Sequence, residues 1–163
     1  MVSEPVIEVE LVPVYTLRRT DNTRKVRALY NLQFPPDTWM GRNQAHWMLS
    51  NDVDPVAGFC SAAYLKDLKC GFFTAAWVRA AVRGGGIQRR MIRTRVNWSK
   101  KQGARFCLTY CAADNYGSLY NLLRCGFQAY WKSGWHVCVL KFEDISAHTI
   151  NAALKRTSWD KGS

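Results

Sequence analysis

The chain has 163 residues and a formal net charge of +11, from 23 Lys and Arg against 12 Asp and Glu. Apolar residues make up 48% of it and aromatic residues 13%, which supports a packed core and excludes a disordered chain. No apolar run reaches the roughly 18–20 residues that a membrane-spanning helix needs, and the N-terminus lacks the pattern of a signal peptide. We expect one soluble, cytoplasmic domain over residues 1–156, followed by a frayed tail over residues 157–163.

The six cysteines lie mostly within apolar runs and form no Cys-x-x-Cys pair. Since the chain has only three histidines, the ligand pattern of a zinc site is missing and no metal is expected. Buried free thiols in a reducing compartment are the expected state, with disulfides as the alternative.

The first half of the chain predicts a strand, a helix and three further strands. Ile7–Tyr15 is rich in β-branched residues, and a helix follows it, capped by Thr20 or Asp21 and ending before Pro35. Asp37–Asn43 fits either a second short helix or a loop on the substrate side. The next strands are His46–Ser50, Val56–Leu65 and Cys70–Val78, of which the last is continuously apolar and therefore central.

The second half predicts a helix, a strand, a helix, a hairpin and a last helix. Gly103 and Gly126 are the expected stops of the first two helices, and Asp114 or Asn115 caps the second. The predicted elements are Ile87–Gln102, Phe106–Ala112, Ser118–Arg124, the hairpin of Phe127–Trp131 and Trp135–Phe142, and Asp144–Lys155.

Three consecutive glycines, Gly84–Gly86, separate the central strand from the basic helix. Glycines accept positive φ and let backbone N–H groups approach a ligand, and the helix that begins at Ile87 points its free N–H groups at the same place. Arg83, Arg89 and Arg90 add charges suited to phosphate. The pattern predicts an anion site; a plain turn beside solvated arginines is the alternative. Neither the dinucleotide nor the mononucleotide glycine motif is present.

The positive charge is concentrated in one stretch. From Leu68 through Ala113 there is no acidic residue, which indicates a polyanionic partner, either a phosphorylated cofactor or nucleic acid. A basic face that serves only solubility is the alternative. The basic residues of this stretch are Lys69, Arg79, Arg83, Arg89, Arg90, Arg93, Arg95, Lys100, Lys101 and Arg105.

Two separated stretches together resemble one family. Arg83-Gly-Gly-Gly86-Ile-Gln88 is similar to the Gln/Arg-x-x-Gly-x-Gly/Ala motif of the GNAT superfamily of N-acetyltransferases, apart from Gln88 at its last position. Asn115 to Phe127 is similar to that family's Asn-x-x-Ala-x-x-Leu-Tyr-x-x-x-Gly-Phe pattern, with Ser118 in place of the alanine. The order of predicted elements agrees over most of the chain.

The resemblance implies an α/β (α+β) fold: a central mixed, mostly antiparallel sheet with splayed middle strands, flanked by helices. It also implies acetyl-CoA in the cleft between Cys70–Val78 and Phe106–Ala112. The main chain near Val78 and Ala80 would hold the pantetheine arm, and Asn115 would face the cofactor. The pyrophosphate would lie on Arg83 and on the N–H groups of Gly84, Gly85, Gly86, Ile87 and Gln88.

The general acid and base are open. The tyrosine that family members often use to protonate the leaving thiolate falls on Leu122, which cannot donate a proton. Tyr116, Tyr120 and Tyr110 are alternatives, each also explained as a core or rim aromatic. Asp114 is the nearest carboxylate that could serve as base, although helix capping explains it equally well. The histidines His46 and His136 sit on predicted strands and are read as structural.

The predicted function is transfer of an acetyl group from acetyl-CoA to an amine. Because the charge exceeds what one cofactor requires, an acceptor attached to DNA or tRNA is a subsidiary hypothesis, with Trp39, Trp47, Trp131 and Trp135 as stacking surfaces. The alternative is a degenerate GNAT fold that only binds nucleic acid or protein. We expect no membrane association, and either a monomer or a homodimer.

Overall fold

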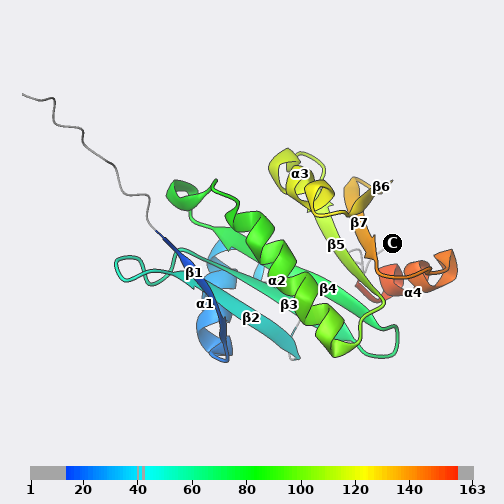
Figure 1. Cartoon of the computed structure of the whole chain (residues 1–163), viewed down its shortest axis with the longest axis horizontal. Helices are drawn as coiled ribbons and strands as arrows, with labels where there is room; N and C mark the ends of the chain where they lie inside the picture. The colour runs from blue at the N-terminus through cyan, green and yellow to red at the C-terminus, as the bar shows by residue number, and fades with distance from the viewer. Residues whose placement is uncertain (1–13, 40, 42, 158–163) are drawn as a thin grey trace, which may run out of the picture.

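Seven strands form one mixed sheet in the order β1-β2-β3-β4-β5-β7-β6, in a computed structural model that describes residues 14–39, 41 and 43–157 (Figure 1). Every neighbouring pair is antiparallel except β4 and β5, which confirms the expected mixed, mostly antiparallel sheet flanked by helices. The elements are β1 Thr16–Thr20, α1 Thr23–Gln33, β2 Gln44–Ser50, β3 Gly58–Leu65, β4 Cys70–Val78, α2 Ile87–Gln102, β5 Phe106–Ala112, α3 Tyr116–Arg124, β6 Gln128–Lys132, β7 Trp135–Lys141 and α4 Ala147–Thr157, with short 3₁₀ turns at Pro36–Thr38 and Ala80–Val82.

Helices cover both faces of the sheet because strand side chains alternate between them. On one face, α2 and α3 pack on the strands, with Met91 and Leu122 in the same buried cluster as Phe73. On the other face, α1 covers the β3–β4 region through Tyr30, and α4 covers β5 and β7 through Leu154. The sheet is therefore the middle layer of three.

Local signals set several boundaries where the sequence predicted them. The helix α2 and the strands β4 and β5 have the predicted bounds. The helix α2 ends at Gly103 because this residue adopts φ +101° and its N–H bonds to the Lys100 carbonyl. Asn115 caps α3 by accepting a hydrogen bond from the Ser118 N–H at 3.3 Å.

The N-terminal predictions need correction. Of the predicted strand Ile7–Tyr15, residues 7–13 lie outside the described residues, and Val14 and Tyr15 precede β1, which is Thr16–Thr20. The cap of α1 is Asn22, whose side chain accepts from the Lys25 N–H at 3.1 Å. Thr20 belongs to β1 instead, and its hydroxyl accepts from the Asn22 N–H at 3.2 Å.

Two further segments differ from the prediction. In place of a helix over Asp37–Asn43 there is one 3₁₀ turn, Pro36–Thr38, and residues 40 and 42 lie outside the described residues. Thr157, predicted to begin the tail, is the buried last residue of α4 and donates its hydroxyl to the Ala153 carbonyl at 2.8 Å. Residues 158–163 lie outside the described residues. None of the helices in the described part of the chain is long and apolar enough to cross a membrane.

Candidate functional site

The strands β4 and β5 form a fork. They pair only from Cys70↔Phe106 to Phe72↔Leu108, and Figure 1 shows them diverging beyond that point. Just past the last pair, Thr74 is an extra residue in β4, because Phe73 pairs with Ala62 of β3 and the next pair is Ala75 with Ser61. A bulge of this kind bends a strand. The splayed middle strands predicted from the sequence are therefore present.

Side chains occupy the edge of β4 inside the fork, where β5 would otherwise pair. The Thr109 hydroxyl donates to the Phe73 carbonyl at 3.2 Å, and Arg95 Nη1 donates to the Ala75 carbonyl at 3.3 Å. Arg95 is only 5% exposed and its guanidinium lies 4.4 Å from the centre of the Phe73 ring. These bonds satisfy two carbonyls that a continuous β4–β5 ladder would use. Packing and hydrogen bonds within the core therefore hold the two strands apart.

Arg95 is a residue of the fork that the sequence analysis counted only as part of the basic stretch. It is buried among apolar groups on the inner side of α2, where burial lowers its pKa, and no carboxylate forms an ion pair with it among the described residues. The spacing in the sequence is a signal for this burial. Arg95 lies four residues after Met91 and four before Ser99, so the three side chains share one face of α2, and all three are buried.

The glycine turn lies at the start of α2. Gly84, Gly85 and Gly86 have φ of +101°, +60° and +77°, which L side chains rarely adopt. A Cβ on Gly84 or Gly85 would meet nothing within 4 Å, and one on Gly86 would lie 3.6 Å from Arg89 Nη2. The turn is therefore open on its outer side, with one guanidinium close to it.

The N–H groups of this turn are without partners. Within the described residues, no acceptor is found for the N–H groups of Gly84, Gly85, Gly86, Gln88 and Arg89, whereas the Ile87 N–H makes a long 3.4 Å contact with the Gly84 carbonyl. Unpaired N–H groups at a helix N-terminus favour an anion. The geometry fits the anion site that the sequence predicted at this turn.

Some of the polar groups just before the turn already have hydrogen-bond partners. Arg83 Nε donates to the Val78 carbonyl at 3.0 Å, so both groups are already engaged. The N–H of Ala80, at the start of a 3₁₀ turn, has no acceptor among the described residues. Gln88, the departure from the family motif, accepts a hydrogen bond from Asn121 Nδ2 at 3.2 Å and so ties the turn to α3.

The candidate acid and base residues gather at the start of α3. Asp114 and Asn115 precede the helix and Tyr116 opens it, with 72% of Tyr116 exposed. Tyr120 is exposed one turn later, and its hydroxyl accepts from Arg124 at 3.2 Å. Leu122 is buried in the core. The catalytic roles of Asp114, Tyr116 and Tyr120 stay predictions.

Other candidates are engaged elsewhere. The Tyr110 hydroxyl lies toward α4, within hydrogen-bonding distance of the Thr157 hydroxyl at 3.0 Å. His46 is buried, with Nδ1 2.6 Å from the Ser61 hydroxyl, and its pKa is lowered by burial and by the charge of Arg19. His136 stacks edge-on against Trp131. The first two have the buried, bonded surroundings of structural residues.

The four tryptophans proposed as stacking surfaces separate into two pairs. Trp47 is buried against Trp98 of α2, and Trp39 lies partly buried against Tyr30 and stacks on His46. The other two, Trp131 and Trp135, are exposed on the β6–β7 hairpin. The first pair therefore belongs to the packing of the sheet, and only the second is available for stacking.

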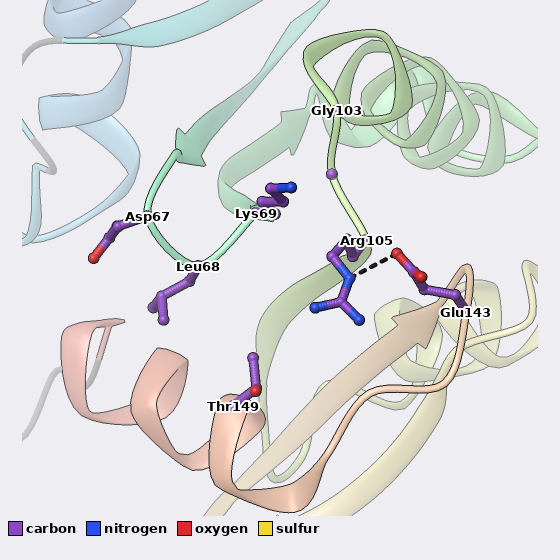
Figure 2. Close-up of a pocket in the computed structure, with 8 residues that line it drawn as sticks. Asp67, Leu68, Lys69, Gly103, Arg105, Glu143 and Thr149 are labelled. Carbon is purple, nitrogen blue, oxygen red and sulfur yellow. Dashed lines mark hydrogen bonds and ion pairs between the residues drawn. The ribbon is translucent and has the colours of Figure 1, made fainter.

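A surface hollow of about 640 Å³ lies at the opposite end of α2, beside Gly103 (Figure 2). It is lined by loop residues and by Thr149 of α4, and its Arg105 is paired with Glu143 at 2.7 Å. Its two carboxylates, Asp67 and Glu143, are paired with Arg156 and Arg105, and it contains none of the predicted site residues. We therefore place the candidate site at the fork and the glycine turn.

Comparisons with known proteins identify the family of the chain and its fold. The model of the acetyltransferase (GNAT) family matches residues 11–127. No curated protein matches the sequence. A GNAT-family acetyltransferase from Staphylococcus aureus Mu50 is similar in structure, with a TM-score of 0.64, 11% identity, and coverage of 80% of this chain and 100% of that one.

Two further solved structures share the fold. NAA60 from Arabidopsis thaliana, in complex with a bisubstrate analogue, has a TM-score of 0.63 and 16% identity, over 78% of this chain and 98% of that one. A dodecameric spermidine N-acetyltransferase from Vibrio cholerae has a TM-score of 0.60 and 12% identity, over 78% of this chain and 93% of that one.

Proposed function

The chain belongs to the acetyltransferase (GNAT) family, and we propose that it transfers an acetyl group from acetyl-CoA to an amine. The observation that carries the proposal is the open glycine turn at the start of α2, which residues 79–83 connect to the strand that forms one side of the fork. The turn lies beyond the open end of the fork, past the Phe73 and Ala75 carbonyls that Thr109 and Arg95 occupy. That arrangement suits a long ligand with phosphate at one end and a reactive group at the other.

The turn fits the pyrophosphate of coenzyme A in three respects. A Cβ on Gly84 or Gly85 would fill open space that a phosphate can use, five backbone N–H groups lack an acceptor within the described residues, and Arg89 lies beside the turn. Hydrogen bonds from N–H groups to a charged phosphate are each worth about 1.5–3 kcal/mol. We assign the pyrophosphate to the N–H groups of Gly84, Gly85, Gly86 and Gln88, and to that of Ile87, whose 3.4 Å contact with the Gly84 carbonyl is long.

Other residues would hold the rest of the ligand. The N–H of Ala80, which has no acceptor among the described residues, is a donor for the pantetheine arm. The Val78 carbonyl can accept a hydrogen bond from the same arm only if Arg83 releases this carbonyl and turns toward the phosphates. Asn115 would face the same ligand from α3. Bound acetyl-CoA supplies an activated thioester carbonyl for attack by an amine. The residues that follow β4 would position that carbonyl, and positioning alone can contribute much of the rate.

Proton transfer is assigned to the residues at the start of α3. We propose Tyr116 as the donor to the leaving thiolate and Asp114 as the acceptor of the proton from the amine, with Tyr120 as the alternative donor. Their shared location and exposure support this assignment, and Leu122 cannot take the role because it lacks a proton to donate.

The acceptor amine is proposed to be attached to a nucleic acid, DNA or tRNA. The support is the charge of +11 and the exposed basic residues of α2, which include Arg90, Arg93, Lys100 and Lys101. No acidic residue of the helix opposes them. A polyanion would gain from every one of these charges through counterion release.

A binding-only role is the second candidate function. Gln88 and Leu122 favour it, since they replace a small residue and a tyrosine of the family motifs. A single assay separates the two functions: acetyl transfer from labelled acetyl-CoA to a panel of polyamines, peptides, tRNA and DNA. Labelled product that falls about 100-fold or more in Tyr116→Phe, with Tyr64→Phe of β3 as the control, supports the enzyme and its donor.

The cofactor part of the proposal has its own measurement. A ligand that binds only the folded state raises its stability by about 2.7 kcal/mol at 100 times its dissociation constant. Acetyl-CoA at millimolar concentration should therefore raise the melting temperature by several degrees. An unchanged melting temperature together with no labelled product on any acceptor would leave the binding-only role.

A further inference from the structure

The β6–β7 hairpin ends in a cluster of exposed aromatic side chains. β6 is the last strand of the sheet, at the edge opposite β1, and all five of its residues are exposed (Figure 1). Tyr130, Trp131 and Trp135 are 49%, 63% and 42% exposed. Large apolar side chains that gather on a surface mark a place where another molecule binds. We call these three residues, with Lys132, the hairpin tip.

The aromatic rings of the hairpin tip lie on both faces of the two-stranded ribbon. Trp131 pairs with His136 and packs edge-on against it at 5.1 Å, so these two share one face. Lys132 pairs with Trp135 and lies two residues after Tyr130, so these three share the other face. A flat partner, such as a membrane surface, can cover one of these faces and leaves the other in water.

The charge around the hairpin tip has one sign. From Asn115 through Phe142 there is no acidic residue, while Arg124, Lys132 and Lys141 fall in that stretch. A second copy of this chain, placed edge to edge along β6, would bring like charges together on a molecule that already carries +11. The partner that complements such a surface is an anion with flat, apolar groups.

The neighbouring helix α3 also carries exposed aromatic and basic side chains, on the way from the hairpin tip to the glycine turn. Tyr116 and Tyr120 are exposed on it, and the Arg124 guanidinium lies 5.7 Å from the centre of the Tyr120 ring. The hydrogen bond between Asn121 and Gln88 connects α3 to the start of α2. Aromatic and basic side chains therefore extend from the candidate site to the edge of the sheet.

We propose that the hairpin tip binds single-stranded nucleic acid, with unpaired bases stacked on Trp131, Trp135 and Tyr130 and the backbone phosphates near Lys132 and Arg124. Unpaired bases stack on aromatic rings whatever their sequence, and a flexible strand can place bases on both faces of the ribbon. The inference rests on the proposed function in one respect only: strand binding at the hairpin tip would bring the acceptor amine to the fork. Binding itself requires no acetyl-CoA.

The test is fluorescence anisotropy with end-labelled single-stranded DNA and RNA of about 20 nucleotides, titrated with the full chain in the absence of acetyl-CoA. Trp131→Ala and Trp135→Ala should each raise Kd by roughly 5- to 150-fold, the effect expected for loss of one stacked base. Trp131→Phe should keep most of the affinity. Leu32→Ala removes an exposed apolar side chain of α1 and should leave Kd unchanged.

Salt dependence separates stacking from charge. Lys132→Ala should reduce the slope of log Kd against log salt by about 0.7, the value for one phosphate contact on a single strand. Trp131→Ala should weaken binding and leave that slope as it is. A thermal melt of each variant verifies folding, which matters most for Trp135→Ala because this side chain is only 42% exposed.

Several results would overturn the inference. One is equal affinity of the wild type and the tryptophan variants for the labelled strand, and another is failure of the wild type to bind it at all. A third is that Trp131→Ala abolishes self-association in gel filtration, or binding to vesicles with anionic lipid, and leaves strand binding intact. Acetyl transfer to any acceptor in the absence of strand binding would refute only this inference, whereas strand binding without transfer would refute only the proposed activity.

Discussion

Substitution of Gly85 by alanine tests the glycine turn, because it adds one methyl group at the place where the phosphate is proposed to lie. Gly85 has φ +60°, and its added Cβ would meet no atom within 4 Å. The cost to the free protein is therefore backbone strain alone, about 1–2 kcal/mol for a non-glycine residue in the left-handed region. For a chain of this size that corresponds to a melting temperature lower by about 2–4 °C per kcal/mol.

The effect on binding should be larger than the effect on stability. The methyl group would stand between the ligand and the unpaired N–H groups of Gly84 to Gly86. Loss of one charge-assisted hydrogen bond of about 1.5–3 kcal/mol raises Kd roughly 10- to 150-fold. Isothermal titration with coenzyme A measures this directly.

Gly134→Ala is the matched control. Gly134 lies in the β6–β7 turn with φ +85°, and a Cβ there would also meet nothing within 4 Å. It should lose similar stability and keep the affinity for coenzyme A. If Gly85→Ala and Gly134→Ala bind coenzyme A equally well, the turn does not hold the phosphates and the assignment of the site is wrong.

Three other predictions concern the fold that supports the site. Gly71→Ala should destabilise the protein by about 1–3 kcal/mol in urea unfolding, because its Cβ would lie 2.6 Å from the Ser99 Cβ of α2. The added Cβ of Gly117→Ala in α3 meets nothing within 4 Å, so this variant should be neutral or stabilised by up to about 1 kcal/mol. Equal urea midpoints for these two variants would contradict the close packing of Gly71 on Ser99. Burial lowers the pKa of His46, so the unfolded chain takes up the proton first as the pH falls below about 6.5. The free energy of unfolding should therefore fall toward acid by up to about 1.4 kcal/mol per pH unit. The variant His46→Phe should reduce this slope, and an unaltered slope would refute the prediction. Cys125 is the one cysteine that is not buried, so a thiol reagent should label one site quickly in the native protein and six after unfolding, with more than one fast site counting against the fold.

The raised pKa values of the buried thiols support the last of these predictions. Burial raises the pKa of Cys60 to about 11, and that of Cys107 and Cys138 to about 12. The reactive thiolate is therefore scarce at neutral pH in the native state.

The sequence by itself determined those features that depend on near neighbours in the chain. The bounds of α2 follow from Gly86 and Gly103, whose left-handed conformations begin and end a helix. The turn itself follows from three glycines, and the cap of α3 from Asn115. Together with the element order, these local features were sufficient for the family resemblance, which the family model over residues 11–127 confirms.

Only the tertiary structure decided which side chains are buried and which are free, because burial depends on strands and helices that are distant in the sequence. Trp47 and Trp131 are both strand tryptophans, yet Trp98 of α2 packs on the first and buries it, whereas the second is 63% exposed. Arg95 is one of ten basic residues in its stretch, and the edge of β4 left bare by the fork gives it a carbonyl to bond in the core. The sequence therefore located the glycine turn that is proposed to hold phosphate, whereas long-range packing determined the fork and the exposed hairpin tip.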